Sequence, residues 1–120
     1  MIHLKRAYDQ RGRGGGKRYL VDRIWPRGVK KEALRLDGWF KDVAPSTGLR
    51  KWFGHDEKKW EEFNHRYRKE LESHPEALDE LRTAAREGDV TLVYSAHDPE
   101  HNNAVALKEY LQGKAAHQRR

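Results

Sequence analysis

The chain has 120 residues and a formal net charge of +6 at pH 7, with 36% hydrophobic and 37% charged residues. That length allows one domain with a single core, and four Trp, five Tyr and three Phe argue against disorder because aromatic side chains bury large apolar areas. The absence of cysteine excludes disulfides, thiolate metal sites and a cysteine nucleophile, and it fits a cytoplasmic protein.

Three strands are predicted in the first half of the chain. Residues 2–8 alternate apolar and polar side chains, which is typical of a strand. Residues 19–25 carry apolar side chains on both faces, and this pattern indicates a central strand that is covered on both sides. Residues 29–36 predict a short helical turn, and residues 38–45 predict the third strand.

Helical patterns dominate the second half. Ser46 can cap a short helix that ends at Phe53, because its hydroxyl can accept a hydrogen bond from the first turn. A longer helix at 57–72 has an apolar stripe at spacings of three and four residues. The remaining predicted elements are a helix from Pro75 to Glu87, a strand at 90–96 and a last helix that Asp98 and Pro99 open and that ends near Leu111.

This order of elements predicts the fold class. Strands separated by helical segments indicate an α/β fold, and we expect a three-layer sandwich with a small, mostly parallel sheet flanked by helices. A single domain is expected over residues 1–112, followed by a basic flexible tail at 113–120. No apolar run approaches the roughly 18 residues that cross a bilayer, and the N-terminus lacks the apolar core of a signal peptide. The sequence therefore predicts a cytoplasmic domain without a membrane partner.

Polar side chains collect where the predicted strands end. Ligands of open parallel α/β sheets bind beyond the carboxyl ends of the strands, and guanidinium groups, amide side chains and the free amides of a helix start all suit an anion. The sequence therefore predicts a pocket for a small anionic ligand, such as a nucleotide or another phosphorylated molecule. The predicted ligand-binding residues are Asp22, Arg23, Trp25, Arg27, Ser46, Arg66, Tyr67 and Asn102.

Asp22 and Arg23 also have an interpretation that needs no ligand. A buried charge without a partner is costly, so each of these side chains must be paired or must face a solvated cleft. Asp22 could pair with Arg66, and Arg23 could pair with Glu70 or Asp42. Both interpretations are open at the level of the sequence.

The long helix and the residue before it supply candidate catalytic groups. Glu70 could act as a general base or orient an arginine, and His55 could exchange a proton near neutral pH. Alternatively, Tyr67 belongs to the core, and Arg66 and Glu70, four residues apart, form a solvated pair. Seven histidines without regular ligand spacing predict no metal site. Neither a GxSxG nor a GxGxxG motif is present to identify a cofactor.

Two other kinds of partner are compatible with the sequence. Much of the positive charge lies in a glycine-rich loop and in the tail, at Arg11, Arg13, Lys17, Arg18, Lys114, Arg119 and Arg120. These segments could form a nucleic-acid-binding module with steeply salt-dependent affinity, although such charges are more often merely solvated. An exposed Trp39, Trp52 or Trp60 would instead mark a protein partner surface.

Four motifs resemble the bacterial family called domain of unknown function 488, in its YeaO-like branch. The motifs are VDRIWPRG, DGWFKDVAPSTGLRKWFGHD, WEEFNHRYRKEL and VTLVYSAHDPEHNNAVALKEYL, and the resemblance runs from residue 2 to about residue 112. It implies a small cytosolic α/β domain and carries no established activity. The segment often written NHA in relatives is Asn102-Asn103-Ala104 here, so this chain lacks a histidine at position 103.

The resemblance also implies where the polar signature of the family lies in this chain. The positions are Asp22, Arg23, Trp25, Pro26, Arg27, Gly28, Pro45, Ser46, Arg50, His55, Phe63, Arg66, Tyr67, Glu70 and Asn102. They fall at the predicted strand exits and on one face of the long helix. This coincidence favours one shared pocket over scattered ion pairs.

Overall fold

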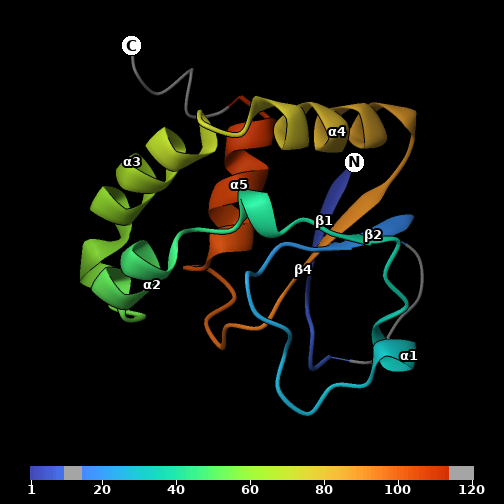
Figure 1. Ribbon diagram of the computed structural model, residues 1–120, viewed down its shortest axis with the longest axis horizontal. Helices are drawn as coiled ribbons and strands as arrows, with labels where there is room; N and C mark the ends of the chain where they lie inside the picture. The colour runs from blue at the N-terminus through green and yellow to red at the C-terminus, as the bar shows by residue number, and fades with distance from the viewer. Residues whose placement is uncertain (10–14, 114–120) are drawn as a thin grey trace.

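A four-stranded parallel sheet organises the protein, as the computed structural model of residues 1–9 and 15–113 shows (Figure 1). The strand order is β1-β4-β2-β3, and all three pairings are parallel. The strands are β1 (Ile2–Arg6), β2 (Lys17–Leu20), β3 (Gly38–Trp39) and β4 (Val90–Tyr94). The α/β fold with a parallel sheet is therefore confirmed, and the three-layer layout stays a prediction.

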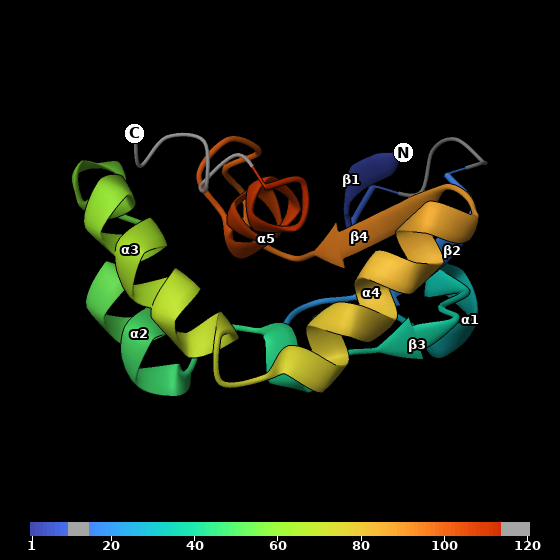
Figure 2. The same ribbon diagram turned by 90° about the horizontal axis from the view of Figure 1, so that it is seen from above.

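Helices connect the strands and cover them. The α-helices are α1 (Lys31–Leu34), α2 (Thr47–Phe53), α3 (Trp60–Leu71), α4 (Pro75–Glu87) and α5 (Asn103–Leu111), and two 3-10 turns are η1 (Lys41–Val43) and η2 (Glu57–Lys59). Figure 2 shows α2 and α3 packed against each other at the end of the molecule opposite α1. Within the described part of the chain, none of these helices has the length and apolar character needed to cross a membrane.

The second and third strands are shorter than the sequence predicts. β2 ends at Leu20, and soon after it the side chains of Asp22 and Arg23 form hydrogen bonds with other loops. β3 ends at Trp39, since the chain then coils into η1 rather than continuing extended to Pro45. Both differences leave a longer polar segment beyond the sheet than the periodicity predicts.

β4 occupies the centre of the core. All five of its residues are buried, and alternate side chains enter different clusters because successive residues of a strand point to opposite faces. Leu92 packs in the larger cluster with Tyr67 and Phe63, whereas Val93 packs in the smaller one with Leu20. The sheet is thus covered on both faces at β4.

Parallel pairing brings the carboxyl ends of all four strands to one edge of the sheet. The segments that follow β1, β2 and β4 begin at this edge. The chain after β3 reaches α2 from the same edge through η1. This is the edge at which ligands of parallel α/β sheets bind.

Candidate functional site

A cavity of about 420 Å³ opens at this edge of the sheet. Its lining comes from the turn after β1, the loop after β2, the segment from Pro45 through α2 to His55, α3 at Phe63, and the segment from the end of β4 to the start of α5. Pockets for small molecules usually measure about 300–1,000 Å³. The cavity therefore has the size of a small-molecule site, at the place the sequence predicts.

The carboxylate of Asp22 fastens two strand exits together beside the cavity. Its Oδ2 accepts hydrogen bonds from the backbone N of Ser95 (2.9 Å) and from Ser95 Oγ (2.6 Å). Its Oδ1 accepts one from Asn103 Nδ2 (3.1 Å), which also donates to the carbonyl of Val21 (2.9 Å). Both carboxylate oxygens of Asp22 thus accept hydrogen bonds from these donors. Arg66 pairs with Glu62 instead, so the predicted pair of Asp22 with Arg66 is wrong.

Arg23 is held by backbone carbonyls rather than by a carboxylate. Its Nε donates to the carbonyl of Pro45 (3.2 Å), and its Nη2 donates to the carbonyl of Ala44 (3.1 Å). The predicted pairs with Glu70 and Asp42 are therefore wrong. Because carbonyls are neutral, Arg23 keeps its full positive charge at the wall of the cavity, where it is only half-buried.

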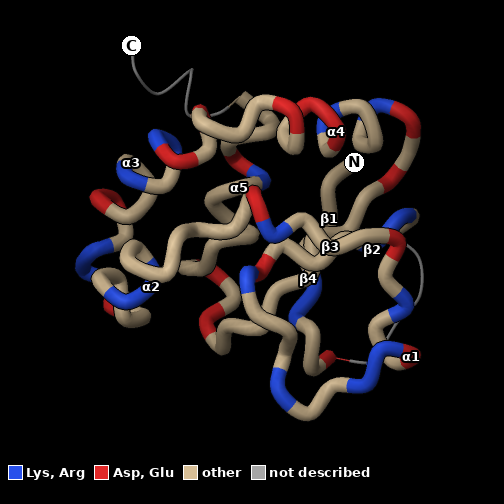
Figure 3. Tube along the Cα trace, viewed as in Figure 1, with Lys and Arg blue, Asp and Glu red and all other residues tan. Residues whose placement is uncertain are grey.

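Three further cations line the cavity: Arg27, Arg50 and Lys51. None of their side chains makes a hydrogen bond, ion pair or cation–π contact with the residues that the structure describes. The backbone of Arg27 is nevertheless fixed, since Tyr8 Oη donates to its carbonyl (3.0 Å). Figure 3 shows Lys and Arg along the loop between β2 and α1 and on α2, the two segments that supply these cations.

The charge of the cavity is strongly unbalanced. Four cationic side chains line it, and the one carboxylate in the described lining, Asp22, already accepts three hydrogen bonds. Cations that share a concave wall raise the local potential and attract anions. The arrangement is suited chemically to an anionic ligand.

Ser46 and Glu70 lie outside the described cavity lining and bind each other. Glu70 Oε1 accepts from the backbone N of Ser46 (2.8 Å), and Oε2 accepts from Ser46 Oγ (2.6 Å). Ser46 Oγ in turn accepts from the backbone N of Leu49 (3.1 Å) and caps α2. The amide and hydroxyl predicted to meet a ligand are thus bound by a carboxylate of the protein, and Glu70 is not placed as a base toward the cavity.

Arg66 and Tyr67 also lie away from the described lining. Arg66 is exposed, pairs with Glu62 (Nε to Oε2, 2.9 Å) and stacks its guanidinium 4.1 Å from the ring centre of Trp52. The predicted solvated pair of Arg66 with Glu70 is therefore wrong. Tyr67 is fully buried and donates its hydroxyl hydrogen bond to the carbonyl of Val43. Burial raises the pKa of Tyr67 well above its ordinary value, and the charges of Asp22 and Glu70 raise it further.

His55, Trp25 and Asn102 do line the cavity. His55 is exposed and has a left-handed backbone (φ 59°), which is uncommon for a residue other than glycine. Asn102 is 2% exposed and caps α5, since its Oδ1 accepts from the backbone N of Val105 (3.0 Å). Its Nδ2 donates to the carbonyl of Asp98 (2.8 Å), so both ends of the amide have protein partners.

The lining residues that the prediction missed include Tyr8, Lys51 and His101. Tyr8 was predicted to be part of the first strand. That strand ends at Arg6, two residues earlier than predicted, so Tyr8 lies in the turn that follows it. Lys51 carried no signal beyond its place after Arg50, which the family resemblance marks. His101 could have been found from its position three residues after Asp98, a spacing at which an aspartate accepts hydrogen bonds from the chain that follows it.

The basic glycine-rich loop and the tail lie largely outside the described residues, since the structure does not describe 10–14 and 114–120. Of their cations, Lys17 is exposed on β2, and the backbone N of Arg18 donates to Asp37 Oδ2 (2.9 Å). Nucleic-acid binding by these segments therefore stays a prediction.

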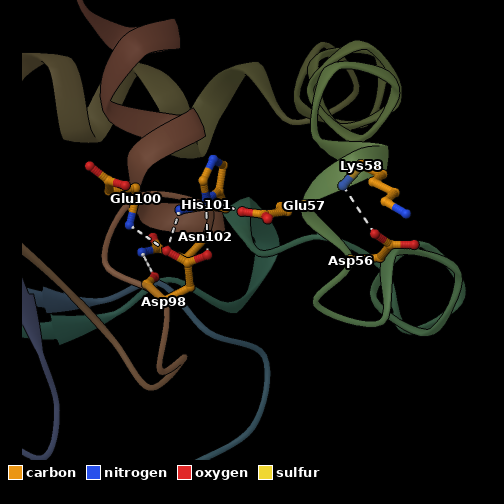
Figure 4. A network of polar contacts seen from close by, with 7 residues as sticks. All are labelled: Asp56, Glu57, Lys58, Asp98, Glu100, His101 and Asn102. Atoms are coloured by element: carbon orange, nitrogen blue, oxygen red, sulfur yellow. Dashed lines mark hydrogen bonds and ion pairs between the residues drawn. The ribbon is translucent and has the colours of Figure 1, made fainter.

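His101 joins the segment after β4 to the start of α3. Its Nδ1 lies 2.9 Å from Asp98 Oδ2 and 3.9 Å from Glu57 Oε2. Its ring and that of Trp60 form a T-shaped pair with ring centres 5.3 Å apart. Figure 4 shows the Glu57 carboxylate directed toward His101, whereas Asp56 turns away and accepts from the backbone N of Lys58. The side-chain atoms of Glu57, Asp98 and His101 that could bind a metal ion lie within 4.8 Å of one another. Nδ1 of the His101 imidazole, however, already takes part in the hydrogen bond with Asp98.

Protonation of His101 should strengthen this junction. The hydrogen bond with Asp98 raises the pKa of His101 above its ordinary 6.5, with further contributions from the charges of Asp98, Glu57 and Glu100 and an opposing one from burial. The same contacts, with backbone hydrogen bonds, lower the pKa of Asp98. A raised imidazole pKa stabilises the folded chain fully below the ordinary value, and the stabilisation is lost as the pH rises through the folded value.

We therefore expect the stability advantage of the wild type over His101→Gln to decrease as the pH rises from about 6 to about 8. Urea unfolding at a series of pH values measures this advantage. His65→Gln, which changes an exposed histidine on α3, is the control for the loss of an imidazole outside this junction. An advantage of the wild type over His101→Gln that does not change with pH would contradict the ion pair.

Comparisons with known proteins cover nearly all of the chain. A family model described as "Inactive DUF488-N3 subclade" matches residues 1–120. "Uncharacterized protein YeaO" of Escherichia coli K12 is 40% identical over 111 residues, which are 92% of this chain and 96% of that protein. "Uncharacterized protein Rv3073c" of Mycobacterium tuberculosis H37Rv is 38% identical over 113 residues, 94% of this chain and 95% of that protein. No solved structure matches. The family match includes every segment that lines the cavity.

Proposed function

Because the chain belongs to the DUF488-N3i family, described as the inactive DUF488-N3 subclade, we propose that its cavity binds a small anionic ligand without converting it. The ligand is a nucleotide or another phosphorylated molecule. Its anionic group contacts Arg27, Arg50 and Lys51, and Arg23 adds a fixed positive charge behind them.

One observation carries this proposal: the cavity collects cations that have no partner within the described protein. Arg27 and Lys51 are exposed and Arg50 is half-buried, so their charged groups are accessible for charge-assisted hydrogen bonds to an anion. Asp22 supplies one negative charge against four cations, and its oxygens bind Ser95 and Asn103 rather than any of the cations. An anionic ligand would complete the electrostatic balance of the cavity.

The positions of the polar groups support binding over catalysis. Glu70, the carboxylate predicted as a general base, holds Ser46 outside the described lining. At position 103, where the family resemblance implies a histidine, Asn103 donates to Asp22 and cannot exchange a proton near neutral pH. His55 is then an imidazole at the cavity without a carboxylate partner among the described residues. Of the two histidines in the described lining, only His101 is oriented by a carboxylate, that of Asp98, and this pair links the segment after β4 to Glu57 of η2.

The proposal is tested by titrating nucleotides, sugar phosphates and pyrophosphate into the protein while following its melting temperature and its heat of binding. We expect at least one phosphorylated compound to bind, and Arg27→Ala combined with Arg50→Ala to weaken it by about tenfold or more, because charge-assisted hydrogen bonds contribute about 1.5–3 kcal/mol each.

Arg86→Ala is the control for a lost positive charge elsewhere, since it removes one arginine from an exposed position on α4 outside the described lining. Its affinity for the same compound should equal that of the wild type. An affinity of the double variant equal to that of the wild type, or the absence of binding across the whole panel, would contradict the proposed function.

A further inference from the structure

Exposed apolar side chains gather beside the cationic cavity. Four large hydrophobic residues in the described part of the chain are strongly exposed, and three of them belong to this region: Tyr8 (40%), Ile24 (59%) and Trp39 (36%). Tyr8 and Ile24 line the cavity together with Trp25, and Trp39 packs edge-on against Trp25 with ring centres 5.5 Å apart. We call Tyr8, Ile24, Trp25 and Trp39 the apolar rim.

The rings of the apolar rim are fixed by hydrogen bonds to the protein. Trp25 Nε1 donates to the carbonyl of Val29 (2.7 Å), and Trp39 Nε1 donates to the carbonyl of Asp22 (2.6 Å). Tyr8 uses its hydroxyl to hold the carbonyl of Arg27 (3.0 Å). The Arg6 guanidinium lies 4.6 Å from the ring centre of Tyr8, and Lys41 Nζ lies 4.2 Å from that of Trp39, so Trp25 is the ring of the apolar rim without a cation over it among the described residues. A ring held in place by such a hydrogen bond loses little conformational entropy when a ligand binds.

The apolar rim and the cations come from the same short segments. Arg27 follows Trp25 by two residues, in a turn where Gly28 has the left-handed backbone (φ 78°) that glycine adopts without strain. Tyr8 ties this turn to the end of β1. A ligand that reaches the cations with an anionic group therefore has an apolar, partly aromatic surface next to it.

A nucleotide combines these two properties in one small molecule. Its phosphate is an anion for arginine and lysine, and its base is a flat aromatic ring that stacks on tryptophan or tyrosine and packs against aliphatic side chains. A sugar phosphate offers only the first property. It would leave the apolar rim in water, where exposed apolar surface is unfavourable.

On the premise that the cavity binds an anion, as proposed above, we infer that its ligand is a mononucleotide whose base lies against Trp25 and Ile24. The phosphate contacts Arg27, Arg50 and Lys51. Stacking tolerates every base, so affinity differs more between a nucleotide and a sugar phosphate than among the four bases.

The inference is tested by calorimetric titration of the full-length protein with adenosine, guanosine, cytidine and uridine 5′-monophosphates and with ribose 5-phosphate. We expect the best mononucleotide to bind about ten- to one-hundredfold more tightly than ribose 5-phosphate, which is the range that stacking of one base on an aromatic side chain provides. Trp25→Leu should remove most of this difference and leave the affinity for ribose 5-phosphate unchanged.

Ile24→Asn is the second variant, because Ile24 is exposed and its replacement does not open the core around Trp25. It should reduce the preference for the mononucleotide without changing the melting temperature of the free protein. Trp52→Leu, a tryptophan of α2 outside the described lining, is the control and should keep the preference.

The outcomes separate this inference from the proposed function. If ribose 5-phosphate binds as tightly as every mononucleotide, and Trp25→Leu and Ile24→Asn change nothing, the inference is wrong while anion binding stands. If none of these compounds binds and the wider panel also fails, the proposed function is wrong and the inference is overturned with it. If adenosine binds as tightly as adenosine 5′-monophosphate, the cations do not contact phosphate, and both are overturned.

Discussion

Asp22→Ala should lower the free energy of unfolding by about 3 kcal/mol, because three donors lose their acceptor at once. Ser95 and Asn103 supply these donors in a partly buried place, where water replaces the carboxylate poorly. A lost hydrogen bond to a charged group costs about 1.5–3 kcal/mol. Urea unfolding followed by tryptophan fluorescence measures the change.

Asp22→Asn separates the charge of this residue from its shape. The amide keeps one oxygen acceptor, so the free energy of unfolding of Asp22→Asn should lie between those of the wild type and Asp22→Ala. Asp42→Ala is the matched control, since Asp42 is exposed on η1 and its carboxylate has no partner among the described residues. It should change stability by about 0.5 kcal/mol or less.

A double-mutant cycle with Ser95→Ala tests whether the contact itself carries the effect. We expect the effects of the two substitutions on stability to be strongly non-additive, because each alone already breaks the hydrogen bond between the Ser95 hydroxyl and the Asp22 carboxylate. Additive losses, or a loss for Asp22→Ala no larger than that for Asp42→Ala, would show that Asp22 does not fasten the two strand exits.

Glu70→Ala should lower the free energy of unfolding by about 2–3 kcal/mol, because both oxygens of this carboxylate accept hydrogen bonds from Ser46 at the start of α2. The backbone N of Ser46 then lacks an acceptor in a partly buried position. Glu70→Gln should lose less, since the amide oxygen can still accept from that N–H while the amide nitrogen cannot accept from the hydroxyl. Urea unfolding measures both variants.

Glu72→Ala, which changes an exposed glutamate just after α3, is the control for Glu70. It should remain within about 0.5 kcal/mol of the wild type. If Glu70→Ala is as stable as Glu72→Ala, the contact with Ser46 does not hold α2 in place. Unchanged ligand affinity in a folded Glu70→Gln protein is expected, because Glu70 is outside the described lining.

The parallel sheet followed from local patterns in the sequence. The alternation in residues 2–8 and the apolar run at 90–96 identified β1 and β4, and helices between the strands indicated parallel pairing, which the structure confirms. Parallel pairing in turn brings the strand exits to one edge. The location of the cavity therefore came from topology, which a single sequence can indicate.

The partners of the polar residues could not be derived in the same way. Asp22 binds Ser95 and Asn103, which follow it by 73 and 81 residues, and no periodicity relates positions so far apart. Glu70 shares a helix face with Arg66, and sequence spacing favoured that pair as strongly as any other. In the structure Arg66 turns to Glu62, because Ser46 offers Glu70 two donors from a neighbouring helix start. Tertiary contacts decide between such alternatives.

The central place of β4 affects how the chain can fold during synthesis. Among the described strands, β1 pairs only with β4, and Ile2 lies beside Val90, so the first strand cannot form these pairings until β4 has been synthesised. β2 can join β3 early, but the connection between the two halves of the sheet waits for the last strand. Pairings between distant positions slow folding and leave strand edges open in the meantime. A nascent chain of this protein therefore carries an unpaired first strand for most of its translation.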